Sequence, residues 1–450
     1  MGRLFGTDGA RGVANTELTC ELAMKIGRAA AMVLINEETE RPKVLIGCDT
    51  RLSGDMLAAA LGAGLCSVGA DVRLVGVIPT PAVAYLVQAY EFDAGIVISA
   101  SHNPFEFNGI KIFQKDGYKL PDAVEEEIEA IILDEVRVPP VKVGAEVGRF
   151  EFAEEEARKD YINHLLTTSG YRFNNLKVAI DCANGASTTT APKLFEYLGC
   201  DVHVLSADPD GININDNCGS THMEQLQNYV KENHCDVGFA FDGDADRLMA
   251  VDENGEIVDG DKTIAICSLN MRDKGKLAHD TAVVTVMSNM GFFKFAEENG
   301  IHCEKTKVGD RYVLENMKEN GYMIGGEQSG HVIFLEYATT GDGELTAIQL
   351  LKAMKHSRKP LSELASVMKV YPQVLVNVKV SKIGKVRFPD DEEIKLAIQK
   401  AEAELGDTGR VLVRVSGTEP LVRVMLEGED TAQIERLAND IAEVIRERLI

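Results

Sequence analysis

Three aspartates at alternate positions stand between two apolar runs, and these residues suggest metal chemistry. They are Asp242, Asp244 and Asp246. Carboxylates this close repel one another unless a cation neutralises them, and hard oxygen ligands suit Mg²⁺ or Ca²⁺. An EF-hand is excluded because Arg247 stands where its sharp turn requires glycine, and strand-like runs flank the loop. A solvated acidic turn is the alternative to a Mg²⁺ site that also takes phosphate oxygens.

A second polar loop offers a hydroxyl nucleophile. Ser101 and His102 follow the apolar run 94–98, and Pro104 ends the loop. α/β sheets present reactive groups beyond the carboxyl ends of their strands, so Ser101 is a candidate nucleophile. No GxSxG elbow surrounds it, and spacing does not locate the partners of a Ser-His-Asp hydrolase. An ordinary turn serine is the alternative, and Ser99 supplies a second hydroxyl nearby.

A glycine-containing loop near the end of the chain has the composition of a phosphate site. Its polar and small residues are Arg414, Ser416, Gly417, Thr418 and Arg423. Backbone N–H groups freed by glycine, two hydroxyls and two guanidinium groups can hold a phosphate without a P-loop. The sequence has no GxxxxGK[ST] motif, so nucleotide binding is unsupported. An ordinary turn is the alternative.

Residues 325–331 form another compact polar loop between apolar runs. Glu327, Gln328, Ser329 and His331 belong to it. Carboxylate and hydroxyl groups suit the vicinal hydroxyls of a sugar, whereas an ordinary turn is again the alternative. His331 by itself is more typical of a structural hydrogen-bonding residue than of a catalyst.

The N-terminal loop 5–12 is also rich in glycine. It lacks the GxGxxG spacing and does not follow a strand, so we do not expect it to bind a dinucleotide. We expect it to present Arg11.

Strands and helices must position these loops, and the apolar pattern predicts them. The runs 43–49, 177–185 and 282–289 each indicate a buried strand that passes through small or polar residues towards a helix. This pattern is typical of βαβ units with mostly parallel sheets. Its recurrence at wide spacing suggests three related α/β domains.

The C-terminal part has a different pattern. We expect a strand over 374–380, a helix over 392–405, a strand pair over 411–426 and an amphipathic helix over 431–449, which together indicate a smaller α+β domain. The predicted domains are 1–153 with the Ser101 loop, 154–255 with the aspartate loop, 256–368 with the sugar-type loop and 369–450 with the phosphate-type loop.

Composition excludes several classes of protein. The 450 residues are 45% hydrophobic and 26% charged, which indicates a folded globular chain. The formal charge of −24 argues against nucleic acid and against an anionic membrane surface, so any phosphorylated ligand needs local cations. Nine scattered cysteines without a CxxC pair suggest neither a disulfide framework nor a cysteine-based zinc site, and fit a reducing cytoplasm. We expect no membrane span and no secretion signal.

Taken together and in order, the loops resemble those of the α-D-phosphohexomutase family. The resemblance rests on the motifs SHNP at 101–104, DGDADR at 242–247, GEQSGH at 326–331 and SGTEP at 416–420, and it covers essentially the whole chain. It implies four domains around a central cleft, three of them related α/β domains with mixed, mostly parallel sheets and the last an α+β domain. The glutamine of GEQSGH resembles the phosphoglucosamine mutase branch of the family.

The resemblance also implies roles for individual residues. Ser101 would carry a phosphoryl group and bind one Mg²⁺ per chain together with Asp242, Asp244 and Asp246. The catalytic or cationic positions correspond to Arg11, His102, Lys111 and His331. The substrate-binding positions correspond to Arg247, Gly309, Asp310, Arg311, Glu327, Gln328, Ser329, Arg414, Ser416, Gly417, Thr418 and Arg423.

The reaction so implied interconverts glucosamine 6-phosphate and glucosamine 1-phosphate, on the route to UDP-N-acetylglucosamine and the cell wall. Glucosamine 1,6-bisphosphate would be both intermediate and activator, and Lys111 or His331 would accept the proton of the attacking hydroxyl. A homodimer, and an activating kinase or bisphosphate donor for Ser101, are further expectations. The alternatives are a phosphomannomutase or phosphoglucomutase of the same family, a Mg²⁺-dependent sugar-phosphate phosphatase, and a non-catalytic sugar-phosphate sensor.

Overall fold

The computed structural model describes residues 3–6, 8–34, 41–416 and 420–450. The chain forms two compact units. The first comprises Met1–Met287 with Ile301–Val367, and the second comprises Ser288–Gly300 with Met368–Ile450. The first unit contains three sheets and the second contains one.

A seven-stranded sheet opens the first unit, with the order β1-β2-β6-β5-β3-β4-β7. Its strands are β1 (Phe5–Gly6), β2 (Gly9–Val13), β3 (Lys43–Cys48), β4 (Asp71–Val77), β5 (Ala94–Ile98), β6 (Phe107–Gln114) and β7 (Phe150–Phe152). Strands β5, β3, β4 and β7 run parallel, whereas β1, β2 and β6 pair antiparallel. The carboxyl ends of β5, β3 and β4 therefore meet at one edge of the sheet.

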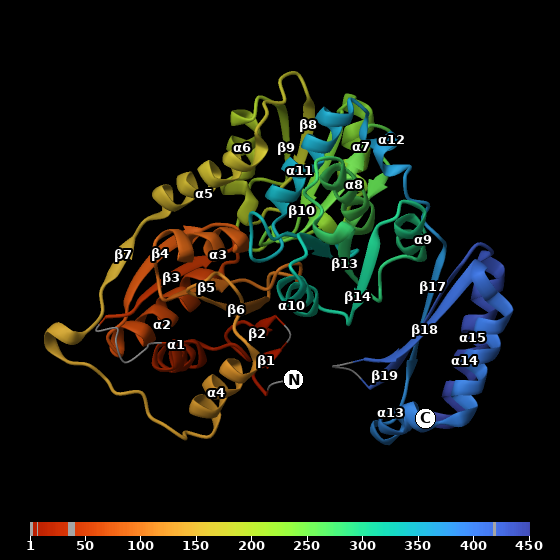
Figure 1. Ribbon diagram of the computed structural model, residues 1–450. Helices are drawn as coiled ribbons and strands as arrows, with labels where there is room; N and C mark the ends of the chain where they lie inside the picture. Colours follow the sequence, from red (N-terminus) through yellow and green to blue (C-terminus); the bar gives the residue numbers. More distant parts are fainter. Residues whose placement is uncertain (1–2, 7, 35–40, 417–419) are drawn as a thin grey trace. The chain divides into compact units, whose positions relative to one another are not determined.

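Five helices accompany this sheet. They are α1 (Cys20–Leu34), α2 (Ser53–Ser67), α3 (Thr80–Ala89), α4 (Asp122–Leu133) and α5 (Glu154–Ser169). Helices α1, α2 and α4 share one buried apolar cluster with β3 and β5, to which Ile26, Leu61, Ile128 and Ile46 contribute. Helices α3 and α5 lie on the opposite face (Figure 1). Burial on both faces explains why the central strands are continuous apolar runs in the sequence.

Two smaller mixed sheets complete the first unit. The five-stranded sheet, in the order β12-β11-β10-β8-β9, contains β8 (Lys177–Asp181), β9 (Asp201–Leu205), β10 (Val237–Phe241), β11 (Leu248–Asp252) and β12 (Ile257–Val258). The four-stranded sheet, in the order β14-β13-β15-β16, contains β13 (Thr281–Thr285), β14 (His302–Thr306), β15 (Ile324–Gly326) and β16 (Val332–Phe334). The associated helices are α6 (Ala191–Tyr197), α7 (Glu224–Asn233), α8 (Gly260–Asp273), α10 (Asp310–Asn320), α11 (Gly343–Ser357) and α12 (Leu361–Ala365), with short 3₁₀ turns at Ala186–Thr189, Gly219–Thr221 and Ala278–Asp280. A further 3₁₀ turn, Gly144–Glu146, precedes β7 of the seven-stranded sheet.

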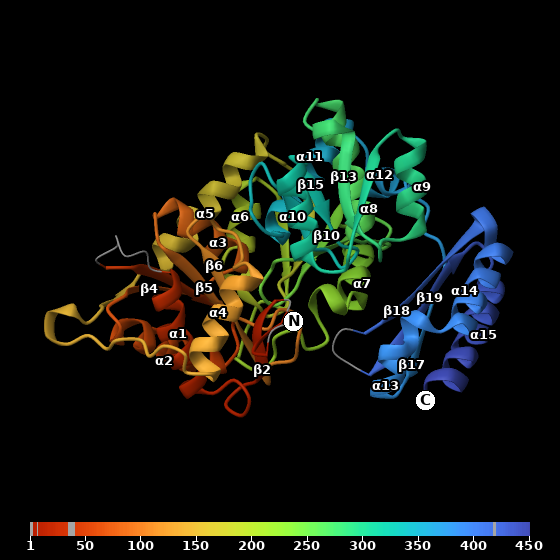
Figure 2. The same ribbon diagram turned by 60° about the horizontal axis from the view of Figure 1, so that its bottom comes forward.

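The second unit is an antiparallel three-stranded sheet with helices. Its strands, in the order β17-β19-β18, are β17 (Gln373–Lys379), β18 (Gly409–Val415) and β19 (Leu421–Gly428). Its helices are α9 (Met290–Glu298), α13 (Lys382–Arg387), α14 (Glu392–Leu405) and α15 (Thr431–Leu449), with 3₁₀ turns at Phe388–Asp390 and Gly406–Thr408. Figure 2 shows α14 and α15 side by side against the sheet, where they bury a common apolar core. Glu427 of β19 joins α9 to this unit by accepting a hydrogen bond from the Met290 amide at 2.8 Å.

The predicted elements are confirmed. Strands begin at Lys43 and Lys177, and β13 covers the start of the third predicted run. In the second unit α14 and α15 have the predicted limits. An aspartate caps the start of each helix; at α14, Asp391 accepts from the amides of Glu393 and Ile394. The predicted fold class, with three mixed, mostly parallel α/β sheets and an α+β C-terminal domain, is also confirmed. The predicted domain boundaries stay predictions.

Candidate active site

The three aspartates occupy the turn of the β10–β11 hairpin. All three are buried, and one carboxylate oxygen from each lies within 4.8 Å of the others. The Oδ1 atoms of Asp244 and Asp246 are buried and accept no hydrogen bond from any described residue. Burial, followed by the charges of its two neighbours, raises the pKa of Asp242 well above its ordinary value. Buried oxygens without partners on mutually repelling carboxylates fit a hard divalent cation such as Mg²⁺.

Ser101 faces this hairpin from the loop that follows β5. Its hydroxyl Oγ donates to Oδ2 of Asp242 at 2.5 Å, and Nδ1 of His102 lies 3.5 Å from the Ser101 Oγ. Burial lowers the pKa of His102 to about 4, with the charges of Arg247 and Arg11 adding to the effect. His102 is therefore uncharged near pH 7. The hydrogen bond to Asp242 directs the Ser101 hydroxyl towards the aspartates.

Ser99 has a different role in the same loop. Its hydroxyl donates to Oδ2 of Asp49 at 2.5 Å and accepts from the backbone amide of Ser101 at 3.0 Å. Both groups are buried. The Ser99 hydroxyl is thus engaged within the seven-stranded sheet, whereas the Ser101 hydroxyl contacts the aspartate loop.

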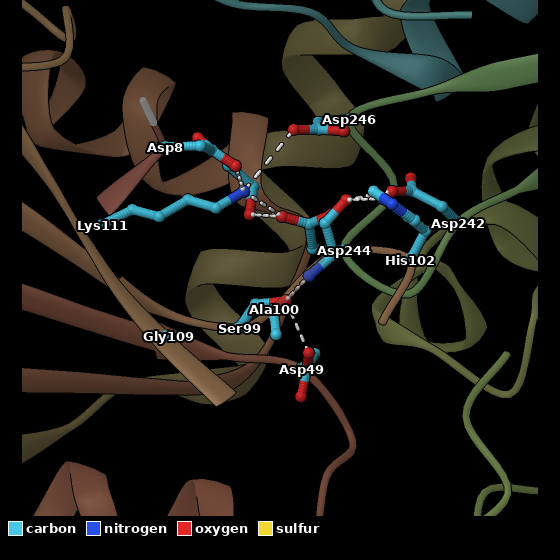
Figure 3. Close-up of polar contacts among 12 residues, drawn as sticks. Asp8, Asp49, Ser99, Ala100, His102, Gly109, Lys111, Asp242, Asp244 and Asp246 are labelled. Carbon is cyan, nitrogen blue, oxygen red and sulfur yellow. Dashed lines mark hydrogen bonds and ion pairs between the residues drawn. The ribbon is translucent and has the colours of Figure 1, made fainter. Parts of the chain in front are cut away.

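Lys111 extends from β6 into a group of carboxylates, as Figure 3 shows. Its Nζ lies 2.7 Å from Oδ2 of Asp244, 3.1 Å from Oδ2 of Asp8 and 3.6 Å from Oδ2 of Asp246. Burial lowers the pKa of Lys111, but Asp244 and Asp8 outweigh that effect and hold the pKa above its ordinary value. Lys111 is therefore an ammonium in this arrangement.

Asp8 is a site residue that the sequence interpretation missed. It contacts Lys111, accepts from Nζ of Lys119 at 2.6 Å and pairs with Arg11, whose Nη1 also donates to the Ala100 carbonyl at 3.4 Å. Asp8 lies in the same glycine-rich loop that suggested Arg11. The only local sign of its role was its position three residues before Arg11, because its other partners, Lys111 and Lys119, are far away in the sequence.

Thr80 also escaped the sequence interpretation. Its Oγ1 donates to Oδ2 of Asp244 at 2.7 Å, and its backbone amide donates to the Asp244 carbonyl at 2.9 Å. Thr80 follows β4, so a second parallel strand of the first sheet helps to orient a carboxylate of the hairpin. Outer groups of this kind fix the direction of a metal ligand.

His331, which directly precedes β16 of the four-stranded sheet, and Arg247, the last residue of the hairpin turn, also lie beside these aspartates. Nε2 of His331 accepts from the Gly341 amide at 3.0 Å, which leaves the ring proton on Nδ1, 3.6 Å from Oδ2 of Asp246. Arg247 donates its amide to Asp242 at 3.2 Å, and its Nε lies 3.8 Å from Asp246. Both predicted residues are thus brought to the aspartates.

The sugar-type loop joins β15 to β16. Oε1 of Glu327 accepts from the Gly309 amide at 3.1 Å, and Nε2 of Gln328 donates at 3.2 Å to Asp259, the residue that caps α8. Ser329 is exposed. The loop and Gly309 therefore lie together, held by the start of a helix and by backbone contacts.

Asp310 and Arg311 begin α10 and point to different partners. Oδ2 of Asp310 lies 2.5 Å from Nζ of Lys119 and 3.5 Å from Nε2 of His331. Nη2 of Arg311 donates to Glu125 of α4 at 3.0 Å and to the carbonyl of Leu120 at 3.2 Å. The guanidinium of Arg311 thus ties α10 to α4, and Asp310 is the member of the pair that joins the ionic network around Asp8.

The phosphate-type loop belongs to the second unit. Arg414 of β18 and Arg423 of β19 stand directly opposite each other in the antiparallel register, and Ser416 is buried. Burial and the charge of Arg423 lower the pKa of Arg414. Like charges placed directly across a strand pair are unfavourable unless an anion offsets them. Gly417 and Thr418 lie outside the described residues.

Four family descriptions match the chain in order. They are Phosphoglucomutase/phosphomannomutase alpha/beta/alpha domain I over residues 2–137, domain II over 159–255, domain III over 259–371 and the C-terminal domain over 375–444. A phosphoglucosamine mutase of Acetivibrio thermocellus is 58% identical over 449 residues, and one of Ruminiclostridium cellulolyticum is 59% identical; each match covers 100% of both chains. A solved phosphoglucomutase/phosphomannomutase family protein from Burkholderia thailandensis has a TM-score of 0.83 and 25% identity, over 99% of this chain and 97% of that chain.

The chain therefore belongs to the phosphoglucomutase/phosphomannomutase family, the α-D-phosphohexomutases, as the motifs predicted. Within that family its sequence lies in the phosphoglucosamine mutase branch. Among the described residues, none of the helices is both long and apolar enough to cross a lipid bilayer.

Proposed function

We propose that this chain interconverts glucosamine 6-phosphate and glucosamine 1-phosphate, with Ser101 as the phosphoryl carrier. The observation that supports this most is the 2.5 Å contact between the Ser101 hydroxyl and Asp242, within a buried group of three aspartates that fits a divalent cation. The full-length identity to chains named phosphoglucosamine mutase supports the choice of sugar.

The reaction consists of two phosphoryl transfers. In the first, the bond between phosphorus and Ser101 Oγ breaks while the 1-hydroxyl oxygen of glucosamine 6-phosphate bonds to phosphorus, which gives the 1,6-bisphosphate. The sugar then reverses its orientation. In the second, the 6-phosphoryl group passes to Ser101 Oγ and glucosamine 1-phosphate leaves, so the enzyme regains its phosphoserine. Such transfers depend on in-line positioning and on charge stabilisation.

The residues around Ser101 supply that stabilisation. Asp242, Asp244 and Asp246, with Ser101, would hold Mg²⁺, which supplies Lewis-acid neutralisation of the phosphoryl oxygens. One ion per chain is proposed. Arg247 and Arg11 add fixed positive charge beside the serine loop, where a phosphoserine brings about −1.5 to −2 units of charge.

Two residues of the same site are proposed to carry the proton. During the first transfer the sugar hydroxyl loses a proton and Ser101 Oγ gains one. Lys111 is proposed to pass the proton between the sugar hydroxyl and the serine oxygen, and in the resting arrangement, where Asp244 and Asp8 hold its pKa above its ordinary value, it supplies positive charge. His331 carries its ring proton on the side of Asp246 and is the alternative proton carrier.

Substrate contacts are proposed for the two remaining loops. Glu327, Gln328 and Ser329, with Gly309 and Asp310, would bind the sugar. Arg414, Ser416 and Arg423 would bind the phosphate that is not being transferred, and the same is proposed for Gly417 and Thr418. Arg311 would act on the substrate only through the position of α10, since α4 occupies its guanidinium.

Phosphorus NMR of the purified protein tests the proposal. Glucosamine 6-phosphate with a trace of the 1,6-bisphosphate activator should give glucosamine 1-phosphate without net release of inorganic phosphate. Steady phosphate release would indicate the phosphatase alternative, and binding without conversion would indicate a sensor. A kcat/KM for mannose or glucose 6-phosphate equal to or above that for the amino sugar would instead indicate a sibling mutase. A homodimer and an activating kinase or bisphosphate donor stay predictions.

A further inference from the structure

A fully buried ion pair lies directly behind the serine loop. Asp49 and Arg51 follow β3, and neither side chain has any exposed surface. Nε of Arg51 donates to Oδ2 of Asp49 at 2.8 Å, and the Arg51 backbone amide donates to Oδ1 at 3.0 Å. The carboxylate therefore fixes both the position and the plane of the guanidinium.

The remaining N–H groups of that guanidinium donate to backbone carbonyls of the serine loop. Nη2 donates to the carbonyls of Ser101 at 2.9 Å and Asn103 at 2.8 Å. Nη1 donates to the carbonyls of Phe107 at 3.1 Å and Pro104. A guanidinium has five N–H donors. One is directed at Asp49 and four at carbonyls of residues 101–107, so Arg51 has no donor left for a substrate.

Asp49 reaches the same serine from its other side. The Ser99 hydroxyl donates to Asp49 and accepts from the Ser101 backbone amide. The pair therefore holds both backbone groups of Ser101, the N–H through Ser99 and the C=O through Arg51. Figure 3 shows Asp49 beside Ser99, on the opposite side of the loop from Asp244.

Ser101 needs such support because its backbone is unusual. Its φ is +53°, in the left-handed region that residues other than glycine rarely adopt. Conformations of this kind persist only where the surroundings over-determine them, and they occur where a functional group must be aimed. Asn215 adds a third contact, with Nδ2 donating to the Ser101 carbonyl at 2.9 Å.

We propose that Arg51, oriented by Asp49, is a positioning residue that holds the backbone of Ser101 so that its hydroxyl faces the aspartate loop. The proposal rests on the proposed function, because it takes Ser101 as the phosphoryl carrier. A buried ion pair is weak evidence for stability, since desolvation offsets most of its attraction. The number and the direction of its bonds to one loop indicate a geometric purpose.

Arg51→Lys is the sharpest test, because lysine keeps the charge but is a compact ammonium with three donors and no planar fork. Turnover of glucosamine 6-phosphate is measured per site that accepts a radiolabelled phosphoryl group from glucose 1,6-bisphosphate. We expect kcat to fall at least tenfold with KM changed less than threefold. Single-turnover phosphorylation of the serine should slow by the same factor.

Two further variants separate positioning from folding. Leu65→Ala removes a buried side chain from the core of the same domain, so it lowers the melting temperature but should leave kcat per labelled site unchanged. Ser99→Ala deletes only the hydroxyl that joins Asp49 to the Ser101 amide, and it should lower kcat in the same direction as Arg51→Lys. If Arg51→Lys does not fold, the kcat per labelled site of Ser99→Ala alone tests the proposal.

Wild-type kcat per labelled site in Arg51→Lys, or in Ser99→Ala when the lysine variant does not fold, would overturn the proposal. So would a loss confined to KM, or a loss of the same size in Leu65→Ala. An inactive wild-type enzyme that nevertheless accepts label at Ser101 would instead contradict the proposed function. In that case the rate of serine labelling alone still tests the positioning role.

Discussion

The hydroxyl oxygen of Ser101 lies 2.5 Å from Oδ2 of Asp242, although 141 residues separate them in the chain. One residue follows a parallel strand of the first sheet, and the other begins the turn of a hairpin in the second sheet. A phosphoserine at this place would add negative charge beside three buried carboxylates. A phosphoserine at this position therefore requires a cation and fixed positive groups nearby to neutralise the added charge.

Replacing Ser101 by alanine should remove turnover while the fold is kept, because a loop hydroxyl contributes little to the core. We expect a loss of about 10³-fold or more in kcat, as for other covalent nucleophiles. Peptide mapping after labelling should find phosphate on Ser101 in the wild type and nowhere in the variant. The exposed Thr221→Ala serves as control. Phosphate on Ser99 in either protein would contradict the assignment.

Asp244→Asn should weaken Mg²⁺ binding and turnover together, since its Oδ1 is buried and accepts no hydrogen bond from any described residue. Loss of one ligand charge should cost roughly tenfold or more in Mg²⁺ affinity, by analogy with the effect of disturbing outer groups. Titration calorimetry measures the affinity. Asp201→Asn, an exposed aspartate on β9, is the matched control.

Chelation provides an independent check of the same site. Activity should disappear on removal of divalent ions and return with Mg²⁺ more fully than with Ca²⁺ or Zn²⁺, because the ligands are carboxylates at a compact site. Full activity after exhaustive chelation would count against a metal.

Lys111→Met should reduce both stability and turnover, because it leaves Asp8, Asp244 and Asp246 facing one another without their shared cation. Breaking a buried ion pair typically costs about 3–5 kcal/mol. The double variant Lys111→Met/Asp8→Asn should recover part of the melting temperature and none of the kcat. Equal recovery of both would mean that Lys111 acts only as a structural counter-charge.

Asp342→Asn should change how stability depends on pH. Burial raises the pKa of Asp342 from its ordinary 3.8 to about 7, although the Leu345 amide and the Tyr161 hydroxyl donate to it. Between about pH 4 and 7 the folded chain keeps a proton that the unfolded chain releases. The free energy of unfolding therefore falls as pH rises through this window, by up to about 1.4 kcal/mol per pH unit from this group.

Asparagine cannot ionise, so the stability of Asp342→Asn relative to wild type should rise from pH 4 to 7 and then level off. Calorimetric melting temperatures over that range measure the difference, with Mg²⁺ held constant. Asp430→Asn makes the same change at an exposed helix cap and serves as the control. A constant difference between Asp342→Asn and wild type at all pH values would refute the assignment.

Arg414→Ala should raise KM for glucosamine 6-phosphate by about tenfold or more, through loss of a charge-assisted phosphate contact, with a smaller effect on kcat. Removing one of two directly opposed guanidinium groups should not destabilise the β18–β19 pair, since like charges across strands repel. Arg436→Ala, on the exposed surface of α15, is the control. Unchanged KM in Arg414→Ala would place the distal phosphate elsewhere.

The sequence by itself determined the strands, the helices and the loops that carry chemistry. The Ser101 loop follows a run of apolar residues that is buried on both faces, and the three aspartates stand between two such runs, so both were recognised locally. Helices α14 and α15 were predicted to the residue because an aspartate caps each one and an apolar stripe continues to its end. The loop motifs together also gave the family, because their order and spacing are far more specific than any single loop.

Only the tertiary structure decided which side chains meet. Lys111 and Asp244 are 133 residues apart, Arg51 lies 50 residues before Ser101, and Asp8 comes from a short N-terminal loop. Local patterns carry no information about such pairings, because hydrophobic periodicity fixes which face of a strand is buried but not which strand is its neighbour. The parallel alignment of β5, β3 and β4 brings Ser101, Asp49 and Thr80 to one edge of the sheet. Packing of the three sheets into one unit then places that edge against the aspartate hairpin.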